Sequence, residues 1–511
     1  MTQLAENNKR IAKNTLLLYI RLFVTMVIGL FTSRVILSTL GVTDYGVNNV
    51  VAGFVAMFSM FTNSLSAAIS RFLTFNLGKG DAEKLKTVFS TSVNIMIAMA
   101  IIVTIVAEIF GLWFLNSKLN IPADRMYAAN WVFHFSVITF AVNLISIPYN
   151  ASIIAHEKMD VFAYISILEV VLKLAVVYML YISPLDKLIT YSFLLLLVSV
   201  FIRIVYGIYC SRKLEECCYS MVFDRTLLKE MGGFAGWNML GTACTMFNTQ
   251  GVNILMNLFF GVVTNAARGI VNQVESVIVQ FVSNFTTALN PQVTKSYASG
   301  NLDYMHSLVY KGTKFSYYLI LIMALPFMFE AEFVLKLWLG EYPEEAPLFL
   351  RLAIIATMVD RLGNTTAVAA WATGNIKKYY IIVSATIIFV FPLTYIAYKI
   401  GAPAYVAYLI FIIFYFVIMW QKVFILKGLT GFQPKEFLKN VMYPITITTI
   451  MAILIPLLTA HYLADNVVGS ILQIIISVMS SIVAIYLFGL TKGEKALMMD
   501  TIQSRIKRIH Q

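Results

Sequence analysis

Charged residues are scarce in this chain of 511 residues: Asp, Glu, Lys and Arg together make up 13%, whereas hydrophobic residues make up 59%. The mean hydropathy is +0.79. Soluble globular domains carry about 25% charged residues. The shortage of charge therefore excludes an ordinary soluble protein and indicates a chain that crosses a membrane many times.

Motifs for the common catalytic chemistries are missing as well. No Gly-x-x-x-x-Gly-Lys-Ser/Thr sequence occurs, which excludes ATP hydrolysis by the P-loop route. The five histidines are scattered, and the four cysteines show neither a disulfide framework nor zinc-ligand spacing. The loops are too short for a soluble catalytic domain. We therefore expect no catalytic residue, no metal site and no cofactor, and we predict a transporter rather than an enzyme.

Apolar segments long enough to cross a hydrocarbon core of about 30 Å recur along the whole chain. They predict an all-α polytopic membrane protein with about fourteen transmembrane helices. The predicted spans are 14–37, 46–70, 88–113, 128–150, 161–182, 188–209, 234–259, 262–290, 311–337, 348–371, 379–398, 403–426, 439–462 and 467–490.

Lysine and arginine concentrate in alternate loops, and such loops remain in the cytoplasm. The opposite loops hold only Lys118, Arg125, Lys187 and Lys399. Both termini are therefore predicted to be cytoplasmic. This asymmetry explains the net charge of +12 without a nucleic-acid partner, and the basic loops are expected to contact anionic membrane lipids.

Short motifs recur at a constant spacing, which indicates an internal repeat. Gly41 and Gly261 follow predicted spans 220 residues apart, and Gly80 and Gly300 repeat that spacing. The segment 155–158 has a counterpart in 372–377. Because six spans separate the copies, the repeat is parallel, giving two six-helix lobes and a C-terminal helix pair. The predicted regions are the N-lobe 1–210, a cytoplasmic linker 211–233, the C-lobe 234–426, and the last pair with a basic cytoplasmic tail 427–511.

Polar side chains recur at helical spacing on four predicted spans, so each set shares one helix face. We interpret these faces as the lining of a gap between the lobes, since intramembrane charges usually mark a substrate path. Serine and threonine also serve as helix-packing residues, and that reading stays open for them. The cavity-lining candidates are Asn48, Asn63, Asn238, Thr242, Asn253 and Asn272.

The two-lobe plan, the turn from Gly41 to Gly46 and the run Pro148 to Lys158 resemble the multidrug/oligosaccharidyl-lipid/polysaccharide exporter superfamily. Within it, the chain is most similar to the Wzx-type O-antigen and capsule-unit flippases. The resemblance implies translocation of undecaprenyl-pyrophosphate-linked oligosaccharides across the bacterial cytoplasmic (inner) membrane, by alternating access of the lobes around a cationic cavity. It also implies a polysaccharide polymerase and a chain-length regulator as partners.

Arginines at membrane depth agree with an anionic substrate, because a guanidinium offers bidentate hydrogen bonds to a pyrophosphate. In related lipid II flippases, arginines on the first and eighth helices face the cavity, and Arg21 and Arg268 match those positions. Arg34, nearer the outer end, is an exit-side contact or a snorkelling anchor. Glu275, two turns from Arg268, is either its ion-pair partner or a protonatable coupling group.

Two other functions compete with this prediction. A cation-coupled multidrug exporter of the same superfamily favours acidic cavity residues, whereas the polar helices here offer three arginines against one glutamate. A membrane polymerase or glycosyltransferase is more remote, because no room for a catalytic domain exists.

Overall fold

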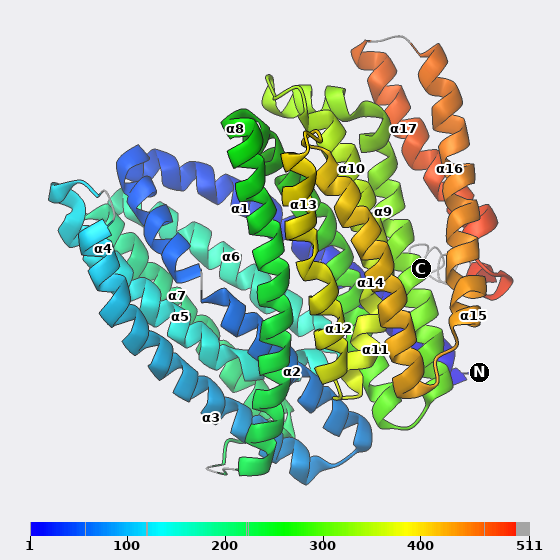
Figure 1. Cartoon of the computed structure of the whole chain (residues 1–511). Coiled ribbons are helices and arrows are strands. Elements are labelled where there is room, and N and C mark those ends of the chain that lie inside the picture. Colours follow the sequence, from blue (N-terminus) through cyan, green and yellow to red (C-terminus); the bar gives the residue numbers. More distant parts are fainter. Residues whose placement is uncertain are drawn as a thin grey trace, which may run out of the picture. The chain divides into compact units, whose positions relative to one another are not determined.

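A computed structural model describes residues 2–56, 58–118, 121–220, 222, 224–463 and 466–496 (Figure 1). Helices account for nearly all of these residues, and none of them lies in a strand. The all-α prediction is therefore confirmed. The described chain divides into two compact units, which we call the N-terminal unit (residues 13–239) and the C-terminal unit (residues 1–12 with 240–511).

The N-terminal unit is built around α5, which contacts α2, α3, α6 and α7. Short π- and 3-10 segments at 107–111, 123–125 and 215–217 join its helices. The α-helices are α1 (Thr2–Ala56, which begins in the other unit), α2 (Ser59–Lys79), α3 (Ala82–Val106), α4 (Leu112–Lys118), α5 (Met126–Ala155), α6 (Met159–Ile182) and α7 (Lys187–Lys213).

The C-terminal unit has two central helices: α9 contacts α10, α11, α16 and α17, and α14 contacts α10 to α13. Two π-helical segments, 438–442 and 485–489, border its last pair of helices. The α-helices are α8 (Arg225–Ala298, which begins in the N-terminal unit), α9 (Leu302–Leu339), α10 (Ala346–Leu362), α11 (Asn364–Ala372), α12 (Lys377–Ile388), α13 (Val390–Lys399), α14 (Val406–Thr430), α15 (Pro434–Phe437), α16 (Tyr443–Tyr462) and α17 (Val467–Ala484).

Ten helical segments of the described chain are long and apolar enough to span a membrane. The remaining four predicted spans, 46–70, 234–259, 262–290 and 348–371, are not among these ten segments. A multi-pass membrane protein is therefore shown, and the total of fourteen spans stays a prediction. The polar composition of α2 and α8 is the same feature that singled them out as candidates for a substrate path.

Helix α8 contains two predicted spans joined by a tight reversal. Gly261 interrupts its helical backbone with φ 84° and ψ −171°, a conformation that only glycine adopts readily. The first half of α8 also packs closely on its neighbours, because a Cβ at Gly241 would lie 2.3 Å from the ring of Tyr380, and one at Gly251 would lie 2.6 Å from the ring of Phe391. The turn at Gly261 therefore determines which residues of the two halves meet.

The turn expected at Gly41 to Gly46 differs from the one at Gly261. The backbone is helical from Thr2 to Ala56, so no loop separates the first two predicted spans. A straight helix of 55 residues would be about 80 Å long, far more than a bilayer. Figure 1 shows that the ribbon of α1 instead changes direction along its course. Residues 41–46 are therefore helical, where the sequence predicted a turn between two spans.

The backbone carries traces of the internal repeat. Gly80 and Gly300 end helices with φ of 74° and 77°, and the next residue in each copy, Asp81 or Asn301, caps the following helix through its side chain. In the second pair of motifs, Glu157 has φ 60° where Gly374 has φ 77°. The repeated spacing therefore corresponds to repeated turn geometry.

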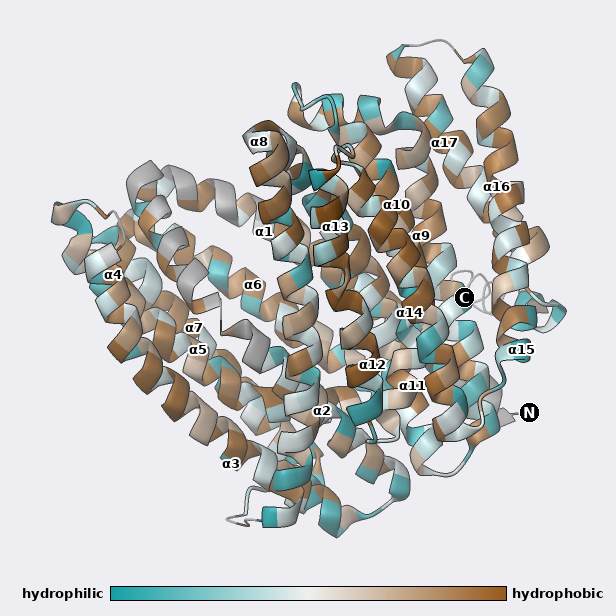
Figure 2. Cartoon of the chain, viewed as in Figure 1, coloured by the Kyte–Doolittle hydropathy of each residue, from teal (hydrophilic) through white to brown (hydrophobic). Residues whose placement is uncertain are grey.

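Large hydrophobic side chains are exposed on many helices, which is expected where lipid rather than water is the solvent. Leu258 is 72% exposed on α8, and Ile413 is 61% exposed on α14. Figure 2 shows hydrophobic residues along α3 and α14, with hydrophilic residues concentrated at helix ends and in connecting segments. The exposed side chains therefore form lipid-facing surfaces.

A buried ion pair attaches the segment after α17 to α9. Lys314 Nζ donates to Glu494 Oε2 at 2.7 Å, and the two side chains are only 5% and 12% exposed. Tyr318 also donates to the carbonyl oxygen of Gly489 at 3.2 Å. Burial by itself would raise the pKa of Glu494, but the hydrogen bonds from Lys314 and Thr491 and the charge of Lys314 together hold this pKa below the ordinary value.

We predict that Glu494→Gln lowers the free energy of unfolding in detergent by about 3 kcal/mol at pH 7, because Lys314 loses its buried partner. A carboxylate with a lowered pKa stabilises above its unfolded pKa and loses this contribution as pH falls through the folded value. The difference from the native chain should therefore shrink below about pH 4. Denaturant titrations at several pH values measure both effects.

Glu332→Gln is the matched control, because the Glu332 side chain is 52% exposed in its pair with Arg351. We expect it to cost less than about 1 kcal/mol. An equal decrease in the free energy of unfolding in the two variants would show that burial does not strengthen the contribution of the Lys314–Glu494 pair.

Candidate functional site

The side chain of Arg268 is enclosed inside the C-terminal unit and is 3% exposed. Its neighbours follow from the reversal at Gly261, which turns the second half of α8 back along the first. Asn253 lies eight residues before this turn and Arg268 seven residues after it. Arg268 Nε accordingly donates a hydrogen bond to Asn253 Oδ1. Two residues predicted to line the substrate path are thus in direct contact.

The other groups in direct contact with Arg268 are uncharged. Its Nη1 atom lies 3.8 Å from the thioether sulfur of Met256. Its Cζ atom lies 5.4 Å and 5.9 Å from the ring centroids of Tyr408 and Phe411 on α14, within the range of cation–π attraction. The guanidinium is therefore held by an amide, a sulfur and two aromatic rings.

Glu275 makes a separate contact further along α8. Its Oε1 atom accepts a hydrogen bond from the hydroxyl of Thr357 on α10 at 2.7 Å. On the same helix, Asp360 and Arg361 pair with each other at 3.1 Å. Within the described chain, no ion pair joins Glu275 to Arg268. In this structure the glutamate is therefore not the direct partner of the arginine.

Arg21 lies on α1 in the N-terminal unit and is half-buried. Its Cζ atom lies 4.8 Å from the ring centroid of Phe162 on α6, which is a cation–π contact. The side chain of Arg34 lies outside the described residues. Of the three predicted arginines, one is thus enclosed and one half-buried.

The other predicted cavity residues differ in exposure. Asn63 on α2 is exposed, and Asn238 near the start of α8 is buried. The half-buried members are Asn48, Thr242 and Asn272. Of these six, Asn253 is in direct contact with a predicted arginine, Arg268.

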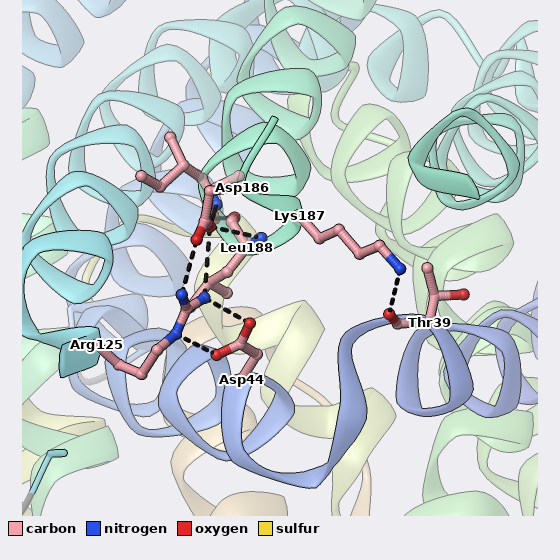
Figure 3. Close-up of polar contacts among 8 residues, drawn as sticks. Thr39, Asp44, Arg125, Asp186, Lys187 and Leu188 are labelled. Atoms are coloured by element: carbon pink, nitrogen blue, oxygen red, sulfur yellow. Dashed lines mark hydrogen bonds and ion pairs between the residues drawn. The ribbon is translucent and has the colours of Figure 1, made fainter. Parts of the chain in front are cut away.

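Sequence reasoning missed a charged network at the predicted outer surface of the N-terminal unit (Figure 3). Arg125 donates to Asp44 at 2.7 Å and 2.5 Å, and to Asp186 at 2.7 Å. Asp186 also accepts from the backbone N–H groups of Leu188 and Ile189, capping α7. The network joins α1, α5 and α7. The sequence places an arginine and several aspartates in the predicted outer loops, which could have suggested ion pairs there. Which of them pair depends on how the helices pack.

Two further ion pairs lie in the N-terminal unit. Lys173 and Glu169, four residues apart on α6, are 2.5 Å from each other, as the helical spacing of opposite charges favours. At the linker, His156 Nε2 and Glu216 Oε1 are 2.6 Å apart, a contact that the sequence did not suggest. Burial alone would raise the pKa of Glu216, but the hydrogen bond with His156, a backbone hydrogen bond and the electrostatic attraction of His156 together hold it below its ordinary value.

Metal binding has no support in the described part of the chain, where no three His, Cys, Asp or Glu residues gather in a manner that would hold an ion. The arrangement instead offers buried cationic and amide groups in apolar helices. Such groups can donate hydrogen bonds to an anion that carries polar substituents.

Comparison with known proteins identifies relatives in sequence and in fold. The sequence profile of the family described as "Polysaccharide biosynthesis protein" matches residues 11–296. No curated protein matches the chain in sequence. Three solved structures are similar to the chain: a MATE protein in the bent conformation, a MOP superfamily transporter from Pyrococcus furiosus, and a Vibrio cholerae MATE transporter in the bent form.

These three structures resemble the chain in fold alone. Their TM-scores are 0.71, 0.69 and 0.69, at identities of 13%, 12% and 14%. The alignments cover 83%, 82% and 86% of this chain, and 96%, 96% and 100% of the other chains. The helical arrangement is therefore that of a known transporter fold.

We predict that Arg125→Gln lowers the free energy of unfolding by about 2 kcal/mol at pH 7, because two partly buried carboxylates lose their shared cation. Burial alone would raise the pKa of Asp186, but the hydrogen bonds from Arg125 and from the backbone of Ile189 and Leu188, with the charge of Arg125, together hold it below the ordinary value. The network therefore stabilises at neutral pH and weakens as pH falls through that lowered pKa. Thermal unfolding at pH 7 and pH 4 tests this.

Arg212→Gln serves as the control, because Arg212 is an exposed arginine near the end of α7. Adding Asp44→Asn to Arg125→Gln should recover part of the loss, since it removes one of the two orphaned charges. If the double variant is less stable than the single one, charge repulsion is not the cause.

Proposed function

Because the chain belongs to the polysaccharide biosynthesis protein family and has the fold of MATE transporters, we propose that it flips undecaprenyl-pyrophosphate-linked oligosaccharides across a bacterial cytoplasmic membrane. The units move from the inner to the outer leaflet and supply O-antigen or capsule assembly. Both termini are cytoplasmic in this proposal. A polysaccharide polymerase and a chain-length regulator are the proposed partners that act on the product.

The observation that supports an anionic substrate best is the environment of Arg268. Burying an unpaired charge in an apolar interior is costly, so a buried guanidinium normally has a carboxylate partner. Among the described residues, the groups in direct contact with Arg268 are neutral, and Glu275 interacts with it only from a distance. A pyrophosphate supplies the missing negative charge together with oxygens that suit the guanidinium geometry.

The order in which the arginines act follows from their depth in the predicted spans. Arg21 lies seven residues, about 10 Å, from the cytoplasmic end of span 14–37. Arg268 lies six residues, about 9 Å, from the outer end of span 262–290. The headgroup is therefore proposed to meet Arg21 first and Arg268 later, as access alternates between the leaflets. The two arginines are therefore proposed to contact the phosphate one after the other, and not at the same time.

Amide and hydroxyl side chains complete the proposed path for the sugar. Exposed Asn63 and half-buried Asn48, Thr242 and Asn272 offer both donors and acceptors, which match hydroxyl groups. Such groups accept many glycans, so they support transport of a polar oligosaccharide without selecting one.

Export of cationic drugs is the competing function, because MATE structures share this fold. Pocket polarity is not constant across that fold: for the Pyrococcus furiosus transporter, reverse polarity of the binding pocket suggests a different function. A buried cation opposes binding of a cationic drug and favours binding of an anion. The electrostatics of Arg268 therefore support the flippase over the drug exporter.

We predict that proteoliposomes containing the native chain move a fluorescent undecaprenyl-pyrophosphate-linked oligosaccharide but not a cationic dye. Arg268→Glu should abolish flipping without preventing membrane insertion, and Arg268→Gln should slow it roughly 100-fold because the buried charge is lost. Arg268→Lys keeps the charge without the bidentate geometry and should lie between them. A leaflet-accessibility assay measures the rates.

Arg351→Gln is the matched control on α10, because Arg351 pairs with Glu332 and plays no part in the proposed path. It should leave flipping near the native rate. Movement of dye without movement of the lipid-linked sugar would overturn the proposed substrate, and native flipping in Arg268→Gln would remove the arginine from the mechanism.

We further propose that Glu275 couples transport to a proton gradient. Its carboxyl group contacts a hydroxyl and no cation directly, so a change in protonation breaks no ion pair. Glu275→Gln should flip substrate at a rate that no longer responds to an imposed pH gradient. Full activity with an unchanged pH response would exclude this role.

A further inference from the structure

Arg268 differs from the paired arginines of this chain in having no carboxylate partner. Arg125 pairs with aspartates at 2.5 Å and 2.7 Å, Arg351 pairs with Glu332 at 2.6 Å, and Arg361 pairs with Asp360 at 3.1 Å. Those arginines are between 22% and 29% exposed, whereas Arg268 is 3% exposed. The most buried of the four is thus the one without a carboxylate in direct contact among the described residues, and Glu275 acts on it only from a distance.

The contact with Asn253 solvates Arg268 without cancelling its charge. An amide oxygen accepts the Nε–H bond as a carboxylate would, but it adds no formal charge. The Asn253 amide is itself oriented, because its Nδ2 atom donates to Gln250 Oε1 at 2.9 Å. The guanidinium is therefore held in one direction and keeps its full positive charge.

The other edge of the guanidinium is held more weakly. Nη1 meets the thioether of Met256 at 3.8 Å, and thioethers are weak acceptors. A phosphate oxygen is a far stronger acceptor for a charged donor. It can replace the sulfur at Nη1 while the Nε bond to Asn253 stays in place.

We propose that Asn253 is a positioning residue that holds Arg268 as an uncompensated cation, so that the phosphate of the transported lipid provides the missing negative charge. This inference rests on the proposed function. It gives a specific role to Asn253, which was predicted only to line the cavity and here acts through the arginine. The neutral charge of the amide is the property that matters, because a carboxylate at the same position would neutralise Arg268 permanently.

Asn253→Asp separates charge from geometry, because the new carboxylate keeps the hydrogen bond and adds an ion pair. We expect the variant to be at least as heat-stable as the native chain. We expect its preference for undecaprenyl pyrophosphate over undecaprenol to fall roughly ten-fold or more, since the guanidinium charge is already satisfied. The two probes share the same tail and differ only in the anion. Titration of the full-length chain in detergent, followed by tryptophan fluorescence, measures both affinities.

Two further variants distinguish positioning from a general structural role. Asn253→Ala removes the acceptor but leaves the charge, so its preference for the pyrophosphate should fall less than that of Asn253→Asp. Gln250→Glu adds the same charge on the same helix without touching the guanidinium, and its effect should also be smaller. A role in packing alone gives the opposite order, with the alanine variant losing most.

The result also separates this inference from the proposed function. If the native chain shows no preference for the pyrophosphate, the proposed substrate fails and the inference fails with it. If the native preference exists and Arg268→Gln abolishes it, but Asn253→Asp keeps it, the inference alone is overturned. An equal loss in Gln250→Glu and Asn253→Asp overturns it too, because a general change in potential then explains both.

Discussion

The burial of positive charge inside apolar helices is the physical constraint on which the rest of this structure depends. Hydrocarbon offers no water to solvate a guanidinium, so every intramembrane arginine must be satisfied by protein or by a substrate. Arg125, which lies in a predicted outer loop, pairs with two aspartates, whereas Arg268 in the interior directly contacts neutral groups. The first arrangement holds helices together and leaves no charge for a ligand. The second keeps a charge available at the expense of stability, as functional sites commonly do.

The turn at Gly261 links this electrostatic arrangement to the chain. Without a residue that adopts φ 84°, the two halves of α8 could not reverse so tightly, and Asn253 would not face Arg268. The close approaches at Gly241 and Gly251 then hold the first half of α8 against aromatic rings of α12 and α13. Glycine therefore has two roles in α8. Gly261 forms the turn that brings Asn253 and Arg268 together, and Gly241 and Gly251 allow the close packing that fixes the first half of the helix.

Much of the fold was predictable because membrane insertion depends on local hydropathy. The ten apolar spans, the break at Gly261 and the pair formed by Glu169 and Lys173 all follow from residues close together in sequence. The bend in α1 was not predicted correctly, since a glycine after an apolar run is compatible with either a loop or a continuing helix. The polar faces of α2 and α8 were visible as periodic patterns, but periodicity does not say which polar side chains touch.

The sequence alone determined the class of protein, the helices, the internal repeat and the excess of positive charge on the polar spans. These properties follow from the composition of the chain and from the regular spacing of residue types along it. Only the tertiary structure decided the partner of each charge: Arg125 meets Asp44 across 81 positions, Lys314 meets Glu494 across 180, and Arg268 meets an amide in place of the glutamate two turns away. Electrostatic pairing acts over a few ångströms, and distances of that size between remote residues exist only after the helices have packed.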